Sequence, residues 1–167
     1  MPVDLVEVIK EGGVPNGFTN VNYVANGEGE LLQLGPISMR VLEDGSRTDN
    51  RFGAVRFVIP PKTPGPPQHI HIMHDETFFV VKGVARFDTG TTHVDATTGD
   101  FVTVPPRSMH TFSNPFDEPA EMICTFTPAY YVEYFRLLAR AAQSGQRLTP
   151  ADMTAAMANY ATLPVKP

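Results

Sequence analysis

Short apolar runs, each four to seven residues long, succeed one another from residue 31 to residue 127, with Gly, Pro, Asn and Asp between them. Strands this short and this evenly interrupted are typical of an all-β sandwich or barrel. We expect strands at residues 31–34, 38–43, 53–59, 69–72, 77–82, 85–89, 92–96, 101–104, 109–113 and 121–127. The prolines of segment 60–67 have no N–H to donate to a sheet, so this segment is expected to be a stiff loop leading into residue 69.

The pattern changes after Pro128. Aromatic and apolar side chains recur at helical spacing across residues 130–144, and Gly145 is a natural helix end. Residues 149–152 read Thr-Pro-Ala-Asp, which predicts an N-cap followed by a second, shorter helix over 153–160. We expect both helices to pack outside the barrel or across its mouth. The resulting division is an N-terminal arm at 1–29, a barrel at 30–128 and a C-terminal helical extension at 129–167.

Histidines and one carboxylate suggest a metal site. Side chains alternate along a strand, so His69 and His71 point to the same side of theirs. Glu76 follows five residues later, and His110 could complete the set from across the sheet. Three nitrogens and one oxygen suit a divalent first-row metal such as Fe, Ni, Co, Mn or Cu.

The same residues lie in two segments that resemble the paired motifs of the cupin superfamily. The first motif places a His-x-His pair, a Glu and a Gly at the spacing of His69, His71, Glu76 and Gly83. Thr63 stands where the motif begins with Gly. This departure affects turn geometry and no ligand.

The second motif matches at Gly99, Pro105, His110 and Asn114, and fifteen residues separate it from the first. Such a short separation resembles that of microbial cupins. Arg107 replaces the Gly that follows the motif's proline, which again concerns a turn and not a ligand.

The resemblance implies a single cupin, a jelly-roll β-barrel with a C-terminal helical extension. Carried over by position, the metal ligands are His69, His71, Glu76 and His110. The resemblance to quercetin 2,3-dioxygenase-like cupins implies a metal-dependent dioxygenase acting on a hydroxylated aromatic, with dioxygen as co-substrate and Glu76 as the base. Two alternatives stay open: an isomerase or cyclase that uses the metal as a Lewis acid, and a small-molecule-binding cupin without catalysis.

Apolar side chains near the ligands indicate the kind of substrate. Alternation places Met73, Phe78 and Phe112 on the ligand side of their strands, and Phe57 and Phe126 lie on apolar strand faces. Most such residues fill the interior of a small barrel. A metal that meets a substrate nevertheless needs an open space beside it, and here that space would be apolar and aromatic.

The remaining candidates are assigned simpler roles. His74 is out of phase with the two strand histidines and His93 lies in a hairpin, so both are expected at the surface. A position in the pocket or beside a ligand is the alternative for His74. Cys124 has no His–Asp partner pattern and is interpreted as a buried structural cysteine.

Composition then excludes several classes of function. The net charge is −5 and no Lys or Arg cluster is present, so binding to nucleic acid has little electrostatic support. A single cysteine excludes an intramolecular disulfide. No signal peptide or membrane-spanning run is found, which favours a cytoplasmic protein without a membrane partner. The apolar residues Val3, Leu5, Val6 and Val8 of the N-terminal arm favour a homodimer.

Overall fold

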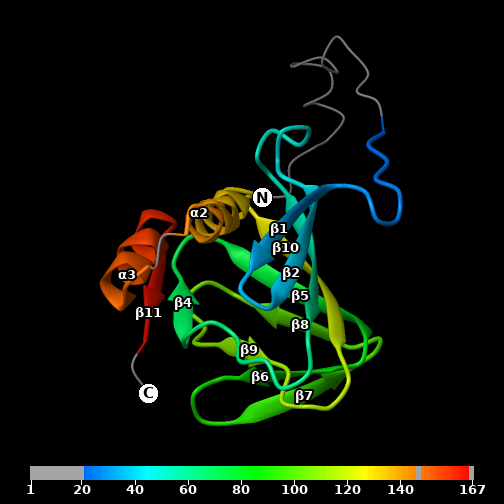
Figure 1. The fold of residues 1–167 in the computed structure, drawn as a ribbon, viewed down its shortest axis with the longest axis vertical. Helices are drawn as coiled ribbons and strands as arrows, with labels where there is room; N and C mark the ends of the chain where they lie inside the picture. The colour runs from blue at the N-terminus through cyan, green and yellow to red at the C-terminus, as the bar shows by residue number, and fades with distance from the viewer. Residues whose placement is uncertain (1–20, 146–147, 166–167) are drawn as a thin grey trace, which may run out of the picture.

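The structure is a computed structural model in which residues 21–145 and 148–165 are described. Its larger sheet has six strands in the order β1-β2-β3-β10-β5-β8, all antiparallel to their neighbours (Figure 1). These strands are β1 (Glu30–Leu34), β2 (Ile37–Glu43), β3 (Gly53–Ile59), β10 (Ala120–Thr127), β5 (Asp75–Lys82) and β8 (Phe101–Val104). Inward and outward positions alternate along β2, β3 and β10, as expected for strands with one face in a core.

A second layer closes the core. It contains a three-stranded sheet in the order β7-β6-β9 and the two-stranded pair β11-β4. The strands are β7 (His93–Thr97), β6 (Val84–Asp88), β9 (Thr111–Ser113), β4 (His69–His71) and β11 (Thr162–Pro164). Aromatic rings join the layers: Phe78 of the large sheet lies 5.0 Å from Phe87 and 5.6 Å from Phe112, measured between ring centroids. The predicted all-β jelly-roll fold is thereby confirmed.

All ten strands expected from the alternation are present, with ends that differ by two residues or fewer. One difference matters for the site. The strand expected at 69–72 already ends at His71, and a sharp bend follows before β5 begins at Asp75. Alternation counted across this bend therefore fails.

Both predicted helices are present. Helix α2 (Tyr131–Gln143) lies against β1 and β3, and helix α3 (Pro150–Asn159) lies beside β11 (Figure 1). Thr149 caps α3 as expected: its hydroxyl accepts from the Asp152 N–H, and the Asp152 carboxylate accepts from the Thr149 N–H in return. Strand β11 was not predicted, and it joins the end of the chain to β4.

The two departures from the cupin motifs are accommodated by the backbone. Arg107 adopts a left-handed conformation with φ of 70°, which is the region that favours the glycine found there in the motif. Its N–H donates to the His71 carbonyl over 2.6 Å. Thr63, at the other departure, pairs with Asn114 through two backbone hydrogen bonds of 2.9 Å.

Part of the chain lies outside this description. The arm residues Val3, Leu5, Val6 and Val8 fall outside the described residues, so the dimer inferred from them stays a prediction. Residues 21–29 of the arm form no helix or strand. Among the described helices, none has the length and apolar character needed to cross a bilayer.

Candidate metal centre

Four side chains from three segments converge inside the barrel. His69 and His71 lie on the same side of β4, and Glu76 follows on β5. His110 is brought opposite His69 by two backbone hydrogen bonds of 3.0 and 3.1 Å. One ligand atom from each side chain lies within 4.8 Å of all the others, and none of the four residues is more than 4% exposed.

Backbone carbonyls orient two of the three imidazoles. The Nδ1–H of His69 donates to the Pro67 carbonyl at 2.8 Å, and the Nδ1–H of His110 donates to the Ser108 carbonyl at 3.1 Å. A carbonyl oxygen can only accept, so the proton of each neutral ring is on Nδ1. This leaves the lone pair of Nε2 available as a ligand. Metal-binding histidines are ordinarily oriented by such a hydrogen bond from the second ring nitrogen.

The donor set fits a divalent cation. Oε2 of Glu76 lies 3.0 Å from Nε2 of His71 and 3.0 Å from Nε2 of His110. Lone pairs and a carboxylate would repel one another at this separation unless a cation lay between them, either protons on the rings or a metal ion. Three imidazole nitrogens and one carboxylate oxygen are ligands that first-row divalent metals accept. The buried cluster of three histidines and one glutamate therefore fits a divalent metal site.

The electrostatics of the cluster suit metal binding. Burial, followed by the neighbouring His110 and His71, lowers the pKa of His69 to about 4, so its ring is neutral and able to ligate. Burial alone would raise the pKa of Glu76, but the hydrogen bonds that the His110 and His71 rings donate to it when they are protonated outweigh burial and lower this pKa. Glu76 is thus a carboxylate at neutral pH.

A thiol supports the second oxygen of this carboxylate. Sγ of Cys124, on β10, lies 3.3 Å from Oε1 of Glu76 and is fully buried. Burial and the adjacent Glu76 charge raise the pKa of Cys124 well above its usual range. The thiol therefore stays protonated and donates to the carboxylate. Sequence reasoning placed Cys124 in the core but did not foresee this contact.

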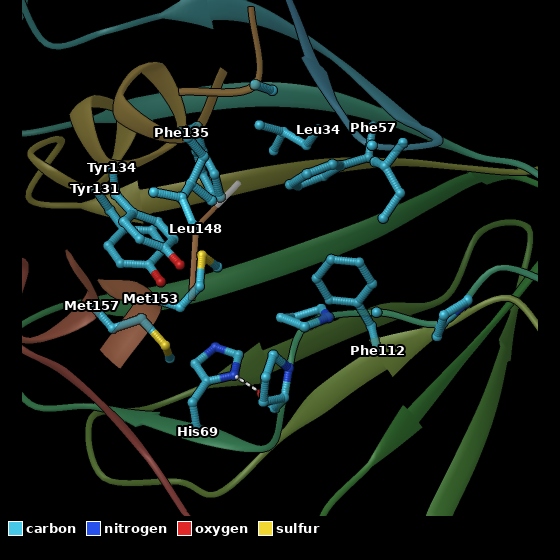
Figure 2. Close-up of a pocket in the computed structure, with 18 of the residues that line it drawn as sticks. Leu34, Phe57, His69, Phe112, Tyr131, Tyr134, Phe135, Leu148, Met153 and Met157 are labelled. Atoms are coloured by element: carbon cyan, nitrogen blue, oxygen red, sulfur yellow. Dashed lines mark hydrogen bonds between the residues drawn. The ribbon is translucent and has the colours of Figure 1, made fainter. Parts of the chain in front are cut away.

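The cluster opens into a cavity of about 450 Å³. His69 and Glu76 of the cluster line it, and Phe57 and Phe112 form part of the wall contributed by the barrel (Figure 2). The rim on the barrel side is the proline-rich loop, from which Pro64, Gly65, Pro66 and Pro67 contact the cavity. Among the described lining residues, Glu76 is the only acid and none is Lys or Arg.

The helical extension contributes the opposite wall. Tyr131, Tyr134 and Phe135 project from α2, and Met153 and Met157 project from α3 (Figure 2). Leu138 of α2 also lines the cavity. The helices therefore cross the mouth of the barrel, one of the two arrangements expected. Helical spacing identified the α2 residues as one face of a helix, but nothing in the sequence showed that this face lines a cavity.

The five residues expected to line the substrate pocket divide into three groups. Phe57 and Phe112 lie on the cavity wall. Phe78 and Phe126 are fully buried in the core and do not line the cavity. The expectation for Met73 is wrong, because its side chain is 72% exposed on the bend that follows β4.

His74 was expected at the surface and is instead buried, with 5% exposure. Its ring lies 4.0 Å from the His71 ring and 4.6 Å from the Tyr131 ring, between centroids. Burial, followed by the nearby His71, lowers the pKa of His74 to about 4. The cause of the error is the same bend, which turns His74 inward and Met73 outward. His93 lies at the surface, as expected.

Comparison with known proteins identifies the barrel. Residues 55–126 match the cupin domain family. Quercetin 2,3-dioxygenase from Bacillus subtilis is 29% identical over 126 residues, which are 75% of this chain. The match covers 36% of that relative's own length, so the chain spans little more than a third of it.

Solved structures share the fold at low sequence identity. A predicted oxalate decarboxylase from Thermotoga maritima matches with a TM-score of 0.58 and 18% identity, covering 64% of this chain and 99% of that one. The nucleoside dehydratase Pac13 from Streptomyces matches with a TM-score of 0.52 and 23% identity, covering 66% and 83%. The match over residues 55–126, the similarity to the Bacillus subtilis relative and the fold shared with solved cupin structures together show that this chain contains a single cupin domain.

Proposed function

We propose that this protein is a metal-dependent dioxygenase that acts on a hydroxylated aromatic molecule of the flavonol or polyketide kind. One observation carries the proposal: the buried cluster of three histidines and one glutamate opens, through His69 and Glu76, into an apolar and aromatic cavity of about 450 Å³. A cavity of this size suits a molecule of two or three rings.

The lining selects against charged substrates. Anionic groups such as phosphates and carboxylates are usually bound by Arg or Lys, and the described lining residues include neither. Aromatic rings from both walls, among them Phe57, Phe112 and Tyr131, instead offer faces and edges against which a flat ring can pack. Sugar phosphates and small dicarboxylates would find no cationic side chain among the described lining residues.

His69, His71, Glu76 and His110 would bind one divalent transition metal, drawn from Fe, Ni, Co, Mn and Cu. The metal would supply the means for dioxygen, a triplet, to react with a closed-shell aromatic. The protein contributes the remaining functions. Glu76 would accept the proton of the substrate hydroxyl, and the Cys124 thiol would keep that carboxylate in place. The apolar walls orient the ring and exclude water.

The similarity to Bacillus subtilis quercetin 2,3-dioxygenase supports this chemistry. Cupins of similar fold also include a nucleoside dehydratase and a sugar phosphate isomerase. A reaction of that kind, with the metal as a Lewis acid, needs no dioxygen and is the competing proposal.

The deciding experiment measures oxygen consumption. The protein is purified, analysed for bound metals, reconstituted separately with each of the five ions, and supplied with quercetin and other polyphenols. We expect at least one metal form to consume one dioxygen per substrate and to be inactive without oxygen. Turnover that continues unchanged under argon would favour the Lewis-acid reaction, and absence of any bound divalent metal would refute the proposal.

A further inference from the structure

Strand β11, which follows α3, lies directly beside β4, the strand that carries two of the candidate ligands. Strand β11 pairs with β4 in antiparallel register, with Thr162 opposite His71 and Pro164 opposite His69 (Figure 1). Thr162 is fully buried, whereas Leu163 on the other face of β11 is 44% exposed. A strand of the extension thus delivers one polar side chain into the interior of the barrel.

That side chain contacts the third imidazole. Oγ1 of Thr162 lies 2.9 Å from Nδ1 of His71 and 3.2 Å from the Tyr160 carbonyl oxygen. A threonine hydroxyl has one proton and a carbonyl can only accept, so a hydroxyl that donates to Tyr160 uses a lone pair of Oγ1 to accept from the Nδ1–H of His71.

His71 differs in this respect from the other two histidines. His69 and His110 are oriented by carbonyls two residues earlier in the chain. The partner of His71 comes from 91 residues away and lies beyond residue 126, where the match to the cupin domain ends. A cupin domain without this extension would not supply the contact.

We propose that Thr162 is a positioning residue of the metal centre, which keeps the proton of His71 on Nδ1 and directs its Nε2 lone pair toward the site. The inference rests on the metal site of the proposed function but not on the reaction with dioxygen. It assigns the C-terminal strand a part in completing the site. Loss of a hydrogen-bonding partner of this kind typically weakens metal binding about 10- to 100-fold.

The test uses the full chain and Zn²⁺, a diamagnetic probe for the divalent site. Thr162→Val keeps the shape of the side chain and removes the hydroxyl, Thr162→Ser restores a hydroxyl, and Leu163→Ala is a matched change on the exposed face of the same strand. Zinc affinity is measured by competition with a chelator, and the ring Nδ1–H protons are observed by NMR in the zinc-loaded proteins.

We expect Thr162→Val to bind zinc about 10- to 100-fold more weakly than wild type and to lose the slowly exchanging Nδ1–H signal of His71. Thr162→Ser and Leu163→Ala should retain both properties within about threefold. Equal zinc affinity and an unchanged His71 signal in Thr162→Val would overturn the inference, as would a serine variant as weak as the valine variant.

Further outcomes separate the role of Thr162 from the proposed dioxygenase activity. If Thr162→Val does not fold, the wild-type spectrum still decides, because a zinc-loaded His71 without a protected Nδ1–H overturns the inference. Failure of the wild-type protein to bind zinc or any of the five transition metals would overturn both this inference and the proposed function. Normal zinc binding with no oxygen consumption would refute the dioxygenase alone.

Discussion

Replacement of Glu76 by Gln should separate metal binding from turnover. The change keeps the length and shape of the side chain but removes the charge that accepts a proton. Nε2 of His69 and Nε2 of His110 stay aimed at the site, because their rings are oriented by the Pro67 and Ser108 carbonyls rather than by Glu76. Three imidazoles therefore remain to bind the ion, and we expect most of the metal to be retained.

The loss of activity should be much larger. Removal of a general base typically lowers a rate about 100- to 10,000-fold, which corresponds to about 3–5 kcal/mol in the activation barrier. A second effect acts in the same direction. The glutamine amide can place its oxygen toward the histidines only by turning its NH2 group toward Cys124, where the carboxylate accepted a thiol hydrogen bond of 3.3 Å.

The assay compares metal content and kcat in wild type, Glu76→Gln and Asp75→Asn. Asp75 is the adjacent acid and is exposed, as alternation predicts, so its replacement changes the net charge equally without entering the site. We expect wild-type turnover from Asp75→Asn. A metal-loaded Glu76→Gln that turns over at the wild-type rate would show that Glu76 is not the base, and loss of the metal would show that it is mainly a ligand.

Four other outcomes are expected. Arg136 of α2 forms ion pairs with acidic groups on two other segments, so Arg136→Gln should lower the free energy of unfolding by about 1–2 kcal/mol in a denaturant titration. Ser46 and Arg136 lower the pKa of Asp44 from 3.8 to about 2. The ionised carboxylate therefore stabilises the fold above about pH 4, and this stabilisation is lost as the pH falls through about 2. When the free energy of unfolding is measured at decreasing pH, Arg136→Gln should lose less of it than wild type does. Leu138→Trp should fill part of the cavity and raise KM at least tenfold with unchanged metal content, whereas Met73→Ala at the exposed bend should leave both unchanged; equal effects would refute the assignment of the cavity. Sedimentation should give the mass of a homodimer, and a mass of 18.3 kDa would reject the dimer.

The barrel and the four candidate ligands could be predicted because both depend on short, regular relationships. A period of two assigns strand faces, and the motif spacings identify which histidines meet, although His69 and His110 are far apart in the sequence. Even the departure at Arg107 is absorbed locally, since one residue with positive φ reproduces the turn.

The predictions that failed concern segments without a regular repeat of apolar and polar residues. Strand β4 has three residues, so counting onward from His71 assigned Met73 inward and His74 outward, the reverse of the structure. Strand β11 escaped prediction because Thr162–Pro164 is too short for a pattern and contains a proline, and its pairing with β4 is a long-range contact. The helical wall of the cavity depends on packing between distant segments, which spacing along one helix does not encode.

The two walls of the cavity differ in how far they can adapt to an occupant. On one side lies the proline-rich rim, whose backbone dihedrals are restricted by its prolines. This loop also packs closely against β9, because a Cβ at Gly65 would lie 1.5 Å from the Phe112 carbonyl oxygen. On the other side lie Met153 and Met157, whose unbranched side chains can change rotamer at little cost. The direction in which a substrate carries its substituents should therefore decide whether it fits. The methionines can move to accommodate a group that extends toward α3, whereas a group that extends toward the proline-rich rim would collide with a loop that cannot move.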